Sequence, residues 1–260
     1  PTFLESMVTE AVREKADCVV SNYLAVDELG KILRCSSFQP SSVNLVTPED
    51  RWMYLSQEVL GYKCGWEVYT RLFRANIIRE KDIRFCQTCE NFAEDLGFSL
   101  EFSLYATKIL CIDYSGYFYV MHRGSMMDTS KNVVKLSQVN EISAYVGEPF
   151  KAVFRGSEYI RFYPVMHFLI MYNQYSKVLG NERYTSIYKE IKKIKRKTWY
   201  KKQVRGIYRC YKPLAKLYGK KVAQQIILFS HYCMGTGNVL DLKQQLHTDG
   251  LLKRSNYAAN

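Results

Sequence analysis

Several short motifs by which common enzyme classes are recognised are missing from this chain of 260 residues. It has no GxGxxG and no P-loop for nucleotides, no GxSxG for a serine hydrolase and no HExxH for a zinc protease. Its four histidines are scattered, and two of them, His167 and His231, lie in apolar helical patterns typical of packed residues. The familiar forms of these classes are therefore excluded, and any chemistry must rest on less conspicuous residues.

Long apolar segments are also lacking. The longest near-apolar runs, 162–172 and 225–234, are too short to cross a bilayer, and the acidic, helical start does not resemble a signal peptide. The eight cysteines are irregularly spaced in apolar surroundings, which is typical of reduced, buried thiols in a cytosolic protein. Cys86 and Cys89 form a single CxxC without a second pair, so a structural role is favoured over a zinc site.

Acidic residues are nearly absent from one segment. Residues 183–221 carry 15 Lys or Arg and a single acid, Glu190, whereas residues 1–182 carry 19 bases and 22 acids. A basic segment of this kind can face an anionic membrane, nucleic acid or simply solvent. Because Trp and Tyr are interleaved with its charges, as in helices that lie on a bilayer, we favour the membrane surface and expect no nucleic-acid partner.

The chain does contain alternating helical and extended patterns, followed by a purely helical region. Helical spacing predicts helices over 2–15 and 94–106, and a capping-box pattern starts another at Thr47. Residues 65–85 run from a short apolar stretch into a helix. Strands are predicted in 17–27 and 31–37, and as a pair separated by a Ser-Gly turn in 108–114 and 116–123. We therefore predict an α/β region over 1–130 and a helical, basic region over 131–260.

Two segments carry groups suited to chemistry. The acidic pair Glu94-Asp95 begins the helix predicted over 94–106; acids are common at helix starts because they complement the helix dipole, so an ordinary helix start is the alternative. The stretch "YVMHRGSMM" (119–127) places an imidazole, a guanidinium and a hydroxyl at a strand end. Those groups suit a phosphate or a metal–phosphate site, and a surface turn is the alternative there.

The order of four segments resembles the second half of family 2 glycosyltransferases with the GT-A fold, especially bacterial enzymes of polysaccharide synthesis. The segments are "ADCVVSNYLAVDELGK", "WEVYTRLFRANII", "IRFCQTCENFAEDLGF" and "YVMHRGSM", and they lie within residues 3–127. The resemblance implies that residues 1–130 are a partial, Rossmann-like GT-A domain. The resemblance is strong over that half and weak over the helical region.

The resemblance also implies roles for individual residues. Asp95 matches the family's catalytic base, which takes a proton from the acceptor hydroxyl in an inverting displacement, and Glu94 would orient the acceptor or stabilise the loop. Trp66 matches a residue at the sugar site. Three positions of the "HRGS" segment match the motif that faces the donor diphosphate: His122, Arg123 and Ser125. His122 is also the candidate metal ligand.

The implied substrates are a nucleotide-sugar donor and a glycan or lipid-linked acceptor, used at the inner, cytoplasmic face of the plasma membrane. The family's DxD motif, which holds Mg²⁺ or Mn²⁺, occurs nowhere in these residues, and neither does the nucleotide-binding half that carries it. A divalent metal is therefore expected for the complete enzyme but is not supported by this chain alone. A partner covering the missing half is one expectation. The alternative function is a truncated, non-catalytic module that binds a membrane or partner through its basic helices.

Overall fold

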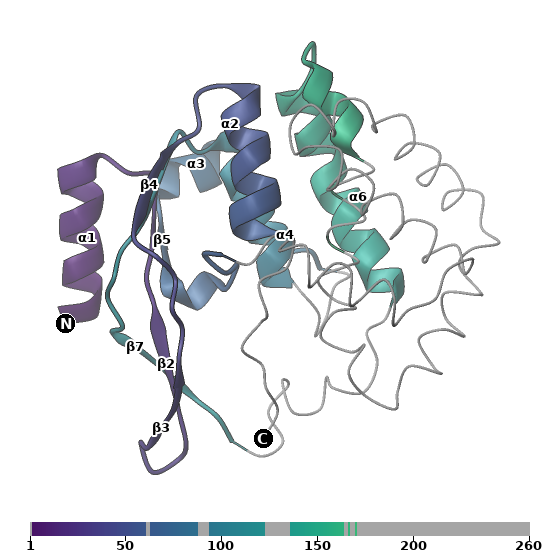
Figure 1. The fold of residues 1–260 in the computed structure, drawn as a ribbon. Helices are drawn as coiled ribbons and strands as arrows, with labels where there is room; N and C mark the ends of the chain where they lie inside the picture. The colour runs from purple at the N-terminus through teal and green to yellow at the C-terminus, as the bar shows by residue number, and fades with distance from the viewer. Residues whose placement is uncertain are drawn as a thin grey trace, which may run out of the picture. The chain divides into compact units, whose positions relative to one another are not determined.

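The computed structural model describes residues 2–60, 63–87, 94–122 and 136–163, together with residues 166 and 170 (Figure 1). The chain divides into two compact units, residues 1–160 and 161–260. Every helix and strand named below begins in the first unit. The predicted boundary near residue 130 and the predicted helices beyond residue 170 lie outside the described residues, so they stay predictions.

The first helix, α1 (Thr2–Glu14), forms where its apolar spacing predicts it. Its inner side meets the main sheet, where Met7, Val19 and Leu110 are buried together with Ala16. Lys15 has a positive φ of 53°, and the helix ends before it because this left-handed conformation does not fit a right-handed helix. In Figure 1, α1 lies on one side of the strands, and α2 (Pro48–Met53) and α4 (Glu94–Tyr105) lie on the other.

The main sheet has four strands in the order β4-β6-β1-β5. The central strand β1 runs parallel to β6 and antiparallel to β5, and β4 runs antiparallel to β6. All three residues of β1 are buried, as expected for a strand covered on both faces. The bounds of the strands are β1 Cys18–Val20, β4 Ser41–Asn44, β5 Arg71–Phe73 and β6 Lys108–Cys111.

A second sheet has three strands in the order β3-β2-β7. Here β2 runs antiparallel to β3 and parallel to β7. The strand predicted over 17–27 is therefore divided between two sheets. The strands predicted in 108–114 and 116–123 are confirmed as β6 and β7, and they lie in different sheets. The bounds are β2 Tyr23–Val26, β3 Ile32–Cys35 and β7 Tyr117–Val120.

The strand predicted over 17–27 is divided at Asn22, which lies between β1 and β2 and makes hydrogen bonds through its buried side chain. Its amide nitrogen donates to the Phe38 carbonyl at 3.1 Å, and its amide oxygen accepts from Phe38 N and from the Ser36 hydroxyl, both at 2.8 Å. A buried amide with its donors and acceptor so used is fixed in one orientation. The chain therefore leaves one sheet and enters the other at this residue.

The remaining helices follow or separate the strands along the chain, and α4 packs against α6. The predicted start at Thr47 is confirmed: Asp50 N donates to Thr47 Oγ1 at 3.1 Å, and Thr47 N donates to the Asp50 carboxylate at 2.9 Å. In α4, Phe98 and Phe102 pack edge-on against Phe73 of β5. The bounds are α2 Pro48–Met53, η1 Tyr54–Val59, η2 Val68–Thr70, α3 Ala75–Glu80, α4 Glu94–Tyr105, α6 Leu136–Val153 and η4 Glu158–Phe162.

The mixed α/β class is confirmed for the described residues. Two short strands, β4 and β5, were not predicted. β4 has three exposed or partly exposed polar residues among its four, so it lacks the apolar alternation by which a strand is recognised. β5 lies inside an apolar stretch that also has helical spacing. Within the described ranges no helix is both long and apolar enough to span a membrane.

Candidate active site

The acidic pair stands where the sequence places it, in the first turn of α4. Glu94 begins the helix and Asp95 follows, with its side chain only partly accessible to solvent. The backbone N–H of Val68, at the start of η2, donates to Asp95 Oδ2 at 3.3 Å. The carboxylate is therefore tied to a segment almost 30 residues earlier in the chain, rather than to its own helix.

The surroundings of Asp95 raise its pKa to about 6. Burial is the main cause, because it disfavours the charged form, and the nearby carboxylates of Glu94 and Glu67 act in the same direction. The hydrogen bond from Val68 and the positive charge of Arg71 oppose the shift. The group is thus protonated in mild acid and ionised at neutral pH, which is the range in which a general base operates best.

Glu67 is a third carboxylate at this site, and no motif or spacing in the sequence points to it. Its Oε2 accepts a hydrogen bond from Trp66 N at 2.9 Å, so the side chain folds back on its own backbone. Gly65 makes room for it: a Cβ at this position would lie 2.3 Å from Glu67 Oε2 and 2.6 Å from the Phe38 ring. Gly65 also has a φ of +65°, which favours glycine.

The indole of Trp66 is buried, with 7% of the residue exposed. Its carbonyl accepts a hydrogen bond from the Ser99 hydroxyl of α4 at 2.7 Å. The residue thus links two elements through its backbone, and its ring has little surface with which to meet a sugar. The prediction that Trp66 stacks on a sugar is untested, but such a contact would require the ring to become accessible.

The buried side chain of Arg71, on β5, binds the backbone just before Trp66. Its Nη2 donates to the Gly65 carbonyl at 2.6 Å, and the Cys64 and Cys18 thiols lie 3.6 and 4.0 Å from the guanidinium nitrogens. The guanidinium is buried, and its Nε has no hydrogen-bond partner in the described part of the chain. It places a fixed positive charge beneath the carboxylates of the site.

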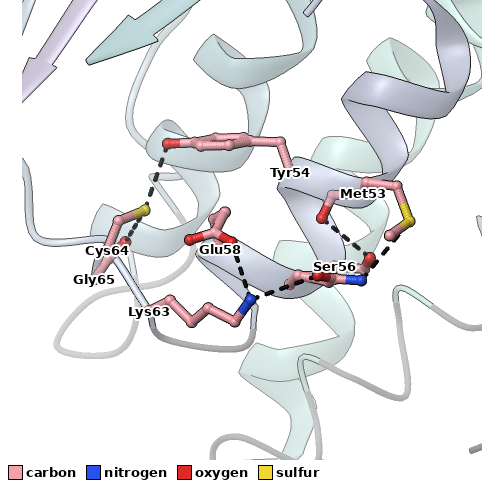
Figure 2. Close-up of polar contacts among 8 residues, drawn as sticks. Met53, Tyr54, Ser56, Glu58, Lys63, Cys64 and Gly65 are labelled. Atoms are coloured by element: carbon pink, nitrogen blue, oxygen red, sulfur yellow. Dashed lines mark hydrogen bonds and ion pairs between the residues drawn. The ribbon is translucent and has the colours of Figure 1, made fainter. Parts of the chain in front are cut away.

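Residues 63 and 64 contact η1 through their side chains, as Figure 2 shows. The Tyr54 hydroxyl lies 3.5 Å from Cys64 Sγ, and Lys63 Nζ pairs with Glu58 at 3.1 Å. Burial raises the pKa of the Cys64 thiol, so this cysteine stays protonated and is a packed residue rather than a nucleophile.

The "HRGS" motif is only partly described. His122 is exposed and follows β7, and the preceding Met121 N donates to the Val26 carbonyl at 2.7 Å. Arg123 and Ser125 lie outside the described residues. The diphosphate-binding role of these residues, like the role of Glu94, therefore stays a prediction. Among the residues with assigned positions, no three His, Cys, Asp or Glu side chains are grouped so as to hold a metal ion.

No protein-family model matches the chain, and no curated protein matches it. Among solved structures, it is similar to the crystal structure of residues 1–349 of TarS from S. aureus, a staphylococcal glycosyltransferase. The match has 14% sequence identity and a TM-score of 0.46, and covers 95% of this chain and 62% of that one. The chain thus spans less than two thirds of that structure. A likeness of this degree gives no information on substrate or reaction.

Proposed function

We propose that the complete protein transfers a sugar from a nucleotide-sugar donor to a glycan or lipid-linked acceptor, with inversion at the anomeric carbon. The observation that carries the proposal is the Asp95 carboxylate. It lies in the first turn of α4, is partly buried beside two other carboxylates, and has a pKa of about 6. The order of segments around it, which resembles family 2 glycosyltransferases, supports the same reading.

In the proposed reaction, Asp95 is the general base. An acceptor hydroxyl attacks the anomeric carbon while its proton passes to the Asp95 carboxylate. The bond from that carbon to the nucleoside diphosphate breaks, and the diphosphate leaves with the electron pair. Because the carboxylate pKa lies near the working pH, Asp95 is ionised before the reaction and is still basic enough to accept the proton.

The other predicted residues have supporting roles in this proposal. Glu94 orients the acceptor hydroxyl, and the positive or hydrogen-bonding groups of the 122–125 motif offset charge on the departing diphosphate. A Mg²⁺ or Mn²⁺ ion would supply further charge neutralisation in the complete enzyme. The described residues do not fit such an ion, because no three suitable ligands are grouped there. We therefore assign no step to it in this chain.

Asp95→Asn in the complete protein tests the proposal. Nucleoside diphosphate release is measured with a panel of UDP-, GDP- and dTDP-sugars and glycan or lipid-linked acceptors, and donor affinity is measured separately by calorimetry. We expect turnover to fall by about 10²–10⁴-fold, the contribution typical of a general base, with donor affinity nearly unchanged. Asp82→Asn is the matched control, because Asp82 is an exposed aspartate whose partner is the exposed Arg84. Retained turnover in Asp95→Asn would exclude Asp95 as the base.

The basic segment 183–221, outside the described residues, is proposed to hold the enzyme at the cytoplasmic membrane face. Co-sedimentation with liposomes that contain anionic lipid tests this, and binding should weaken when the bases of 189–221 are neutralised. Binding that is unchanged by neutralisation would contradict it. The second candidate function, a non-catalytic module, is favoured by the lack of a DxD motif in the sequence. A complete protein that binds liposomes but no nucleotide sugar would support that candidate.

A further inference from the structure

Helix α4 makes two hydrogen bonds to the backbone of the 66–68 segment, from residues one turn apart. Asp95 Oδ2 accepts from Val68 N at 3.3 Å, and Ser99 Oγ donates to the Trp66 carbonyl at 2.7 Å. Residues four apart lie on the same side of a helix. The base and the serine therefore contact the same short segment from one face of α4.

Ser99 binds a partner outside its helix, unlike Ser103, the serine one turn further along α4. A hydroxyl in the middle of a helix commonly bonds to the carbonyl four residues earlier, and Ser103 does so, donating to the Ser99 carbonyl at 2.6 Å. Ser99 is completely buried, yet its hydroxyl reaches out of the helix to Trp66. A buried hydroxyl with a partner in another segment fixes the relative position of the two.

The 66–68 segment is held on both sides of this contact. Arg71 Nη2 binds the Gly65 carbonyl at 2.6 Å, and Ser21 N, at the end of β1, binds the Thr70 carbonyl at 2.9 Å. These two bonds tie the ends of the segment to the sheet. Between these ends, the Ser99 bond and the longer Asp95 bond connect the segment to α4, at 2.7 and 3.3 Å.

We propose that Ser99 is a positioning residue for the catalytic base: its hydrogen bond to the Trp66 carbonyl sets the 66–68 backbone against α4 so that the Val68 N–H meets the Asp95 carboxylate. The catalytic part of this inference rests on the proposed function. The structural part, that Ser99 controls the hydrogen bonding of Asp95, does not.

The charged groups that face Asp95 come from three places in the chain. Glu94 precedes it on α4, Glu67 lies in the loop before η2, and Arg71 lies on β5. Ser99→Ala removes none of them. A change in the titration of Asp95 in this variant therefore reports on the bond from Val68, which stabilises the ionised carboxylate and so lowers its pKa.

The experiment compares the complete wild-type protein with Ser99→Ala and with Ser103→Ala, which deletes an equally buried hydroxyl of the same helix. The pKa of Asp95 is measured by following its side-chain carboxyl carbon by NMR as the pH is varied, without any ligand. We expect the Asp95 midpoint to rise by about half a pH unit in Ser99→Ala, the size expected for one long hydrogen bond to a charged acceptor. Ser103→Ala should titrate like wild type.

Activity gives a second reading. In Ser99→Ala the acid limb of the pH–rate profile should shift to higher pH together with the Asp95 titration midpoint. Turnover should therefore fall about threefold below pH 6 and little at pH 8. An Asp95 midpoint equal to that of wild type, or an equal rise in Ser103→Ala, would overturn the proposal.

The test of Ser99 still gives an answer if Ser99→Ala does not fold or if Asp95→Asn stays active. If Ser99→Ala does not fold, Ser99→Cys keeps most of the volume with a weaker donor; a rise of the same sign is expected, and a wild-type midpoint overturns the proposal. If Asp95→Asn stays active, Asp95 is not the base and the catalytic part of this inference fails, but the ligand-free titration still decides whether Ser99 controls the hydrogen bonding of Asp95.

Discussion

The buried guanidinium of Arg71 donates to the Gly65 carbonyl at 2.6 Å, although six residues and a change of direction separate the two along the chain. This bond closes the loop that carries Trp66, Glu67 and Val68. The loop in turn presents a backbone N–H to Asp95. The position of the candidate base Asp95 thus depends on Arg71 of β5 through the loop between them: Arg71 binds the Gly65 carbonyl, and Val68 binds Asp95.

Arg71→Lys is expected to loosen the loop. A lysine has a single nitrogen at the end of a flexible stem and cannot reproduce the planar fork of a guanidinium. We expect the free energy of unfolding to fall by about 1–3 kcal/mol, the cost of a buried hydrogen bond lost between a charge and a carbonyl. Urea unfolding measures it, with the exposed Arg79→Lys of α3 as control. Equal stability of the two variants would show that Arg71 does not hold the loop.

Local signals in the sequence predicted much of the fold. The start of α2 could be recognised because Thr47 and Asp50 bind each other's backbone within one turn, so the whole motif lies in four residues. The start of α4 at Glu94 and the helix α1 follow from local spacing in the same way. The acidic pair was found because its helix start could be recognised.

The rest depends on contacts between distant residues. The division of the first strand at Asn22 requires Phe38, sixteen residues away, and the hydrogen bond at the Trp66 carbonyl requires Ser99, 33 residues away. Glu67 becomes part of the site only because Gly65 turns the chain. None of these is visible as a spacing or a composition. Arg123 and Ser125 were predicted to face the donor diphosphate from the chemistry of their side chains and from the resemblance; they lie outside the described residues and are still untested.

Gly65→Ala should damage the site through two separate causes. The φ of +65° disfavours any side chain, and a Cβ would lie 2.3 Å from Glu67 Oε2. Gly30→Ala is the matched control: Gly30 has a φ of +81°, but a Cβ there meets nothing within 4 Å. We expect about 1–2 kcal/mol of destabilisation for Gly30→Ala and clearly more for Gly65→Ala, measured by urea unfolding. Equal losses would mean that Glu67 moves aside without cost.

The raised pKa of Asp95 predicts how stability depends on pH. The folded protein holds the proton up to about pH 6, whereas an unfolded aspartate loses it near pH 4. The folded state therefore binds more protons between these values, and the contribution of Asp95 to stability is complete below pH 4 and is lost as the pH rises to 6. At pH 8 the buried charge destabilises the protein.

Asp95→Asn removes that charge, so we expect it to stabilise the protein at pH 8 by about 1–3 kcal/mol, the equivalent of one to two pKa units. The gain should shrink towards zero at pH 4, where the wild-type carboxyl is protonated and resembles the amide. Urea unfolding of both proteins at pH 4 and pH 8 measures the difference, with the exposed Asp82→Asn measured beside them for comparison. A variant that is less stable than wild type at pH 8, while equally stable at pH 4, would mean that the Val68 bond outweighs burial. The substitution that we expect to reduce turnover strongly should therefore strengthen the fold, as is common where an active site holds an unfavourable charge.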